Sequence, residues 1–302
     1  MRIVQAGQPF LPANRSTDTL LSRTLLTLPE KNRQLLWQRT VDAKCENQYA
    51  LASHLLPADP RLPAMRATAN GRKPHKEAVC AKAFWQILAT AVKCGEFRRE
   101  PNGGKSPPSP QPSPPGEGER ARASGHPRPS DGSPRPSDGR GVRGEGPDSS
   151  AADQPELLLT NKEERRRMND LLNYGYAVLL SSVLQKLFGV GLDPTWGLSH
   201  APRERCTPLA YDLMEPFRPC VDWRVFQWLR DHPDRTQWEV SKEFRKWVTA
   251  FPLERVDYLE FTLEIQGVIE GVTRGFRRAV LEDNPRYYRP WTPRNSKWAG
   301  SS

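Results

Sequence analysis

Cysteine is sparse in this chain of 302 residues, and none of its five cysteines belongs to a CxxC pair. They stand at positions 45, 80, 94, 206 and 220. An odd number of thiols in a chain that is neither small nor loop-rich argues against a disulfide framework and against a structural zinc site. The pattern favours reduced thiols, as in cytosolic proteins.

Long apolar runs are missing as well. No stretch approaches the roughly 18–20 residues that a membrane-spanning helix needs. The N-terminal stretch MRIVQAGQPFLPANRS lacks the apolar centre of a signal peptide. The sequence therefore predicts a protein with no membrane association that resides in the cytoplasm.

Acidic residues are outnumbered, because 35 Asp and Glu face 45 Lys and Arg and leave a net charge of +10. Such a balance favours a polyanionic partner, with nucleic acid ahead of an anionic membrane surface. The plain alternative is a basic protein whose charge serves only solubility.

Aromatic residues are absent from residues 101–150, which contain 12 prolines and 10 glycines. This composition cannot bury enough apolar surface to offset the entropy of the chain, so we predict a disordered insertion over 101–160. The hexapeptide PRPSDG occurs twice there, at 127–132 and 134–139. Both an inert linker and a peptide-docking segment fit such a tract.

Confident hairpin signals are lacking elsewhere, and the remaining sequence is typical of helices. Apolar residues recur at helical spacing in four segments, while weak strand candidates occur only near the N-terminus. Asn169 can cap the third segment and Gly189 can end it. The sequence predicts an all-α fold, a multi-helical catalytic domain with a vestigial N-terminal β region. The four predicted helices are 32–56, 77–92, 169–188 and 256–283.

One short stretch, 191–218, gathers polar chemistry. Pro194 and Gly197 predict a loop, and the turn that follows places Asp212 and Glu215 three residues apart on one face. Two carboxylates beside His200 would suit Mg²⁺ or Mn²⁺ better than zinc. The ordinary alternative is a solvated acid pair, with the histidine in a surface loop and an Arg218–Glu215 ion pair.

Several motifs resemble the CRISPR-associated endonuclease/integrase family, whose members are the larger of the two proteins that insert new spacers into CRISPR arrays. These motifs are LNYGYA at 172–177, the G-L-x-P-x-x-G loop at 191–197 with its following histidine, and DLMEPFR at 212–218. Upstream, EAVCAKAFW at 77–85 and the helix LPEKNRQLLWQRTVDAKCENQYALASHLL at 28–56 are similar to two further family patterns.

The resemblance implies a site and a reaction. Glu77, His200 and Glu215 would be the catalytic metal ligands, with Asp212 as a further ligand or an acid beside them, holding Mg²⁺ or Mn²⁺. A 3′-hydroxyl of a captured DNA fragment would attack a phosphodiester of the repeat, a transesterification that a divalent ion promotes. Arg218 would either clamp a phosphate or serve as a structural partner of Glu215.

The resemblance also implies partners: double-stranded DNA, a second copy of the chain in a homodimer, and the small companion adaptation protein. DNA contacts are expected from basic side chains that bind phosphates without reading sequence. The principal candidates are Arg218, Arg203, Arg205, Arg165, Arg166 and Arg167. Further candidates on helix faces are Arg39, Lys44, Arg98, Arg99, Arg274, Arg277 and Arg278.

The family places a β-sandwich before its helical domain, whereas only about 25 residues precede the first motif here. The expected organisation is a remnant of the N-terminal region, a first helical part, the insertion, a second helical part and a tail. A catalytically impaired relative that only binds DNA is the alternative function, and an unrelated basic scaffold that docks partners through the Pro/Gly-rich tract is a third. The five expected parts are 1–25, 26–100, 101–160, 161–285 and 286–302.

Overall fold

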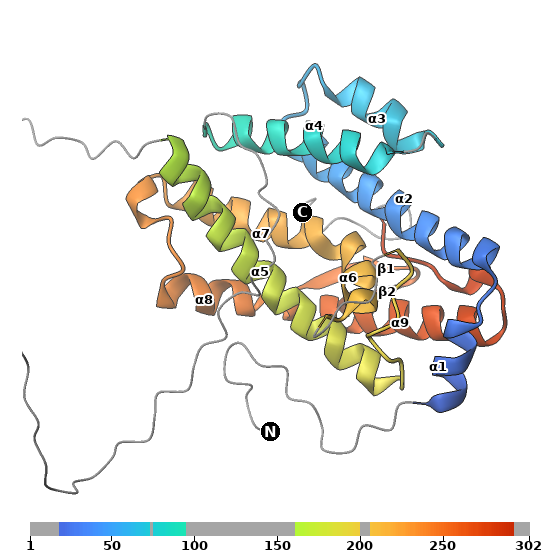
Figure 1. Ribbon diagram of the computed structural model, residues 1–302. Coiled ribbons are helices and arrows are strands. Elements are labelled where there is room, and N and C mark those ends of the chain that lie inside the picture. The colour runs from blue at the N-terminus through green and yellow to red at the C-terminus, as the bar shows by residue number, and fades with distance from the viewer. Residues whose placement is uncertain (1–17, 73–74, 95–160, 200–205, 293–302) are drawn as a thin grey trace, which may run out of the picture. The chain divides into compact units, whose positions relative to one another are not determined.

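A computed structural model describes residues 18–72, 75–94, 161–199 and 206–292 (Figure 1). Within these ranges the chain is helical apart from one two-stranded antiparallel sheet. The all-α prediction is therefore confirmed. The predicted insertion, the N-terminal strand candidates and most of the tail lie outside the described residues, and the expected boundaries of the parts remain predictions.

The first helices form a layer around one long element. Helix α2 (Glu30–Leu55) follows α1 (Thr19–Leu26) and packs against α3 (Leu62–Asn70) and α4 (Lys76–Ala91). Figure 1 shows α2 and α4 side by side, in blue and teal. The predicted helices at 32–56 and 77–92 are thus confirmed to within two residues.

Helix α5 (Asn161–Gly189) is the central element of the second half, since α6, α7, α8 and α9 all pack against it. It ends at Gly189 as expected, but the cap prediction is wrong. The helix begins two turns before Asn169, whose side chain instead donates a hydrogen bond to the Arg165 carbonyl at 3.0 Å. Acidic residues in the first turn, Glu163 and Glu164, favour the earlier start because they complement the helix dipole.

After the loop, three elements follow one another without a break: α6 (Pro208–Met214), the 3₁₀ turn η1 (Glu215–Phe217) and α7 (Arg218–Asp231). Prolines that we expected to disturb the helix lie instead in the first turns of η1 and α7. Proline is tolerated there because its missing N–H has no helical acceptor.

The segment predicted as one helix over 256–283 is two structures. Strands β1 (Arg255–Tyr258) and β2 (Phe261–Glu264) form a hairpin, and only then does α9 (Ile265–Leu281) begin. Side chains that are β-branched or aromatic favour the strands, and Leu259 accepts a left-handed φ of 56° at the turn. Short elements η2 (Arg235–Gln237), α8 (Lys242–Thr249), η3 (Phe251–Leu253) and η4 (Pro285–Tyr287) complete the described chain.

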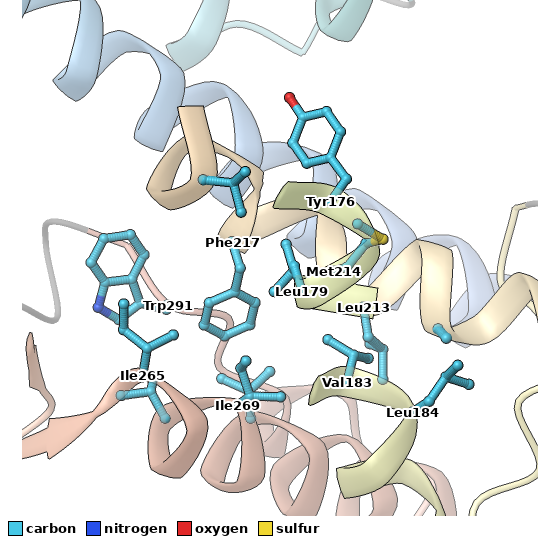
Figure 2. Packing of buried hydrophobic residues seen from close by; sticks show 14 of the residues in the cluster. Tyr176, Leu179, Val183, Leu184, Leu213, Met214, Phe217, Ile265, Ile269 and Trp291 are labelled. Atoms are coloured by element: carbon cyan, nitrogen blue, oxygen red, sulfur yellow. The ribbon is translucent and has the colours of Figure 1, made fainter. Parts of the chain in front are cut away.

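Two apolar clusters support the fold. The larger one joins α1, α5, α6, α7, α8 and α9, and Figure 2 shows its centre, with Phe217 pointing among Trp291, Ile265 and Ile269. The smaller cluster lies between α2, α3 and α4 and includes Trp223 of α7. The junction of the two clusters, where α2 meets α4 and η1, is therefore anchored on both sides.

Helices α5 and α7 approach closely at Gly175, within the LNYGYA motif. A Cβ atom there would lie 2.5 Å from Cγ1 of buried Val221. We expect Gly175→Ala to lower the free energy of unfolding by about 1–3 kcal/mol, because a branched side chain in a packed core cannot give way. Thermal or urea unfolding measures this change. Gly267→Ala in α9 is the matched control: its nearest neighbour would be at 3.8 Å, so helix propensity should make it neutral or stabilising.

Within the described residues, no helix is both long enough and apolar enough to span a bilayer.

Candidate functional site

Glu77 lies at the start of α4, as its second residue. The residue before the helix, His75, has a left-handed φ of 64° and an exposed side chain. A carboxylate in the first turn is stabilised by the helix dipole, which explains an acid at this place without any ligand. The side chain of Glu77 is 35% exposed, so it faces solvent as well as the protein.

Glu215 is the first residue of η1 and is only 4% exposed. Its position is secured from α2, because Asn47 donates hydrogen bonds to the Pro216 carbonyl at 2.6 Å and to the Trp291 carbonyl at 2.9 Å. A buried amide with two backbone acceptors leaves little freedom to the turn it holds. The Glu215 carboxylate is thereby directed towards α2.

Lys44 of α2 connects the two carboxylates. Its Nζ lies 2.5 Å from Glu77 Oε1 and 2.5 Å from Glu215 Oε2. Burial by itself lowers the pKa of Lys44, but the charges of Glu215 and Glu77 outweigh it, so the pKa is raised and the ammonium stays charged. The expectation that Lys44 presents its charge to DNA from an open helix face is wrong, since the residue is 9% exposed.

Two of the three predicted ligands are thus brought together. Because Glu77 Oε1 and Glu215 Oε2 each lie 2.5 Å from one nitrogen, both oxygens converge on one cationic point. Hard carboxylate oxygens around a single point fit Mg²⁺ or Mn²⁺. The third predicted ligand, His200, lies outside the described residues. Among those that are described, no three His, Cys, Asp or Glu side chains gather as a metal site.

Asp212 holds the end of the loop. It is fully buried, and its Oδ2 accepts hydrogen bonds from the backbone N–H groups of Leu198 at 2.5 Å and Ser199 at 3.3 Å. The loop is held further at Leu209, whose N–H donates to the Pro194 carbonyl at 3.0 Å. Asp212 therefore anchors the backbone that leads directly into His200, and its service as a metal ligand remains a prediction.

Arg218 opens α7 and lies next to Glu215. Its Nε is 3.0 Å from Glu215 Oε1, and its guanidinium lies over the ring of Tyr176 at 4.9 Å. Burial lowers the pKa of Arg218, and the charge of Glu215 more than compensates, so the pKa is raised. The tyrosine hydroxyl donates in turn to buried Asp222. Of the two roles expected for Arg218, the structural partnership with Glu215 is observed, and phosphate clamping stays a prediction.

The basic triplet at the start of α5 is partly engaged within the protein. Arg166, 64% exposed along its side chain, pairs with Asp170 at 3.2 Å. Arg167 pairs with Glu163 at 3.3 Å and also donates to the Thr236 carbonyl. Arg165 is half-buried, while Arg203 and Arg205 lie outside the described residues. DNA contact by these five arginines remains a prediction.

Sequence reasoning did not assign a role to Lys44 or to Asn47. Both belong to the helical pattern KCENQ, and their spacing of three residues places them on one face of α2. That face is turned to the site because α2 packs against α4 on one side and η1 on the other. A lysine and an asparagine on a shared face, off the apolar stripe, were the available signal.

A protein-family model agrees with part of the chain. The model described as "CRISPR associated protein Cas1" matches residues 160–247, which include the loop, Asp212, Glu215 and Arg218. Glu77 and Lys44 lie outside this match. The resemblance expected from the motifs is confirmed for this region.

Curated relatives are similar over short stretches. The chain is 39% identical over 97 residues to "CRISPR-associated endonuclease Cas1 1" of Moorella thermoacetica, covering 28% of each chain. It is 37% identical over 87 residues to "CRISPR-associated endonuclease Cas1" of Leptospira interrogans, covering 29% of this chain and 33% of that one. A Korarchaeum cryptofilum relative with the latter description is 44% identical over 63 residues, 21% of this chain and 18% of its own. Each alignment thus spans about a third or less of the relative.

Solved structures share the fold. "Casposase bound to integration product" superposes with a TM-score of 0.58 at 14% identity, over 92% of this chain and 73% of that one. "Partial Cas6-RT-Cas1--Cas2 complex" gives a TM-score of 0.56 at 15% identity, over 96% and 78%. At these identities the likeness concerns the fold alone.

Proposed function

Residues 160–247 make the chain a member of the Cas1 family, and on that premise we propose that it is a metal-dependent DNA endonuclease/integrase of CRISPR adaptation. In this proposal the protein inserts spacer DNA into a CRISPR array. The 3′-hydroxyl of the fragment attacks a phosphodiester of the repeat, and the former 3′-oxygen leaves as a new hydroxyl.

The observation that carries the proposal is the convergence of Glu77 and Glu215 on one cationic point, with an oxygen of each at 2.5 Å from Lys44 Nζ. Glu77 comes from the region before 101–160 and Glu215 from the region after it. A solvated acid pair would not be expected to meet a partner from the other half of the chain in a largely buried place.

Mg²⁺ or Mn²⁺ bound there would lower the pKa of the attacking hydroxyl and offset the charge that develops on the phosphate. Glu77, Glu215 and His200 are the proposed ligands. Asp212 positions His200, because it fixes the backbone N–H groups of the two residues before it. Arg218 holds Glu215 in place through the ion pair at 3.0 Å, and from there its guanidinium could also reach a phosphate oxygen.

Double-stranded DNA is the proposed substrate, and the net charge of +10 supports a polyanionic partner. Arg166 and Arg274 keep 64% and 68% of their side chains exposed and supply charge at the surface. A solved relative is titled as a complex of Cas1 with Cas2. We propose the same kind of small companion protein, together with a second copy of this chain, as partners, and the cytoplasm as the compartment.

A strand-transfer assay tests the function. The full chain is incubated with a double-stranded fragment bearing 3′-hydroxyl ends and a plasmid that carries a repeat, with and without the companion protein. We expect joined products with Mg²⁺ or Mn²⁺, none in EDTA, and none with His200→Ala. Retention of joining by His200→Ala would contradict the site, and salt-sensitive DNA binding without any joining in metal would favour the DNA-binding alternative.

A further inference from the structure

The point where the two carboxylates converge is already taken by a positive charge. Lys44 reaches it from the middle of α2, and its side chain is only 11% exposed. Each of the two oxygens lies 2.5 Å from its Nζ, close to the contact that a small divalent ion would make with the same atoms. The ammonium and such an ion cannot occupy this point together.

Charge balance explains why the lysine is held there. Two carboxylates, Glu77 and Glu215, face two cations, Lys44 and Arg218, and Glu215 contacts both of them through separate oxygens. Without Lys44, two like charges would face each other in a largely buried place, which is unfavourable at these distances. The lysine therefore keeps the acids together when no ion is bound.

We propose that Lys44 is an internal counter-ion that holds Glu77 and Glu215 converged and is displaced when a divalent ion binds. This inference rests on the proposed function, because it takes those two carboxylates as ligands. Displacement needs only rotation of a flexible four-carbon stem, while Arg218 stays with Glu215 through its own oxygen. The lysine then sets the metal concentration at which the site fills, and it positions the ligands without taking part in the reaction.

Two variants of Lys44 should change metal affinity in opposite directions. Lys44→Met removes the competing charge, so Mn²⁺ should bind at least about tenfold more tightly. It should also raise the melting temperature of this variant more than that of the native protein. Lys44→Arg keeps the charge and adds a forked donor suited to carboxylates, so Mn²⁺ should bind more weakly. Isothermal titration with MnCl₂ at constant pH and ionic strength measures both without any DNA.

The matched control is Lys186→Met, which removes a partly buried lysine that bridges α5 and α9 through Glu270 at 3.1 Å. It should cost stability and leave Mn²⁺ affinity unchanged. Unchanged or weaker binding by Lys44→Met overturns the inference. If that variant does not fold, Lys44→Arg decides: weaker binding supports the inference, and equal or tighter binding overturns it.

The same titrations separate this inference from the proposed function. If the native protein binds Mn²⁺ and Glu215→Gln does not, the metal site stands whatever the lysine variants do. If the native protein binds no more Mn²⁺ than Glu215→Gln does, the metal site fails, and the inference fails with it.

Discussion

Replacing Glu215 with glutamine is expected to lower metal-dependent strand transfer by about 10²- to 10³-fold, the usual loss when an electrostatic group at a developing charge is removed. The shape of the side chain is kept, but both carboxylate oxygens are replaced by an amide. Glu215 would no longer offer a charged ligand, and Lys44 and Arg218 would lose their shared partner. Product formation over time with excess Mg²⁺ or Mn²⁺ measures the effect.

Stability must be measured alongside, because Glu215 is 4% exposed and pairs with two cations. Breaking such buried pairs by removing one member typically costs about 3–5 kcal/mol. Glu77→Gln is the matched variant: its side chain is 35% exposed and pairs only with Lys44 among the printed contacts, so it should lose far less stability. Equal loss of activity in both variants, with unequal loss of stability, indicates a shared metal site. Full activity in folded Glu77→Gln would contradict the assignment.

Asp212→Ala is expected to have the second largest effect, by releasing the loop that leads to His200. The change leaves the N–H groups of Leu198 and Ser199 without their acceptor in a buried place, at about 1–3 kcal/mol for each unsatisfied group. If His200 is a ligand, losing its support should also lower activity by about 10- to 100-fold, as is usual for groups that orient ligands. Thermal unfolding and the strand-transfer rate measure the two effects.

Asp212→Asn distinguishes anchoring from metal ligation. Asparagine keeps a side-chain oxygen that can accept from the two N–H groups, but it carries no charge. If Asp212 acts through the loop, this variant should retain most of the stability and of the activity. A loss as large as that of Glu215→Gln would instead indicate that Asp212 contacts the metal itself.

Local patterns were sufficient for most helices. The apolar spacing at 32–56 and 77–92 predicted α2 and α4, and Gly189 correctly ended α5. The pattern was insufficient at 256–264, where alternating apolar residues fit both a strand and a helix over so short a run. Pairing of Val256 with Leu263 across the hairpin selected the strands, and such a contact is not visible in local periodicity.

The exposed or buried state of polar residues on α2 was the second limit. Periodicity assumes one buried face and predicted that Lys44 would face solvent. Helix α2 is covered on two sides, by α4 and by η1, so its polar face is buried as well. The burial of Asn47 against the carbonyls of Pro216 and Trp291 has the same cause.

The sequence by itself determined the helical class, the basic charge and the candidate ligands, because helix periodicity, composition and short motifs are local properties of the chain. Tertiary structure alone decided that Glu77 meets Glu215, that Lys44 lies between them, and that Asp212 fixes the loop rather than lying solvated on its turn. These outcomes depend on which helix faces are covered by which neighbours. Such burial is a long-range property, set by the packing of α2 against two elements from opposite sides of the 101–160 tract.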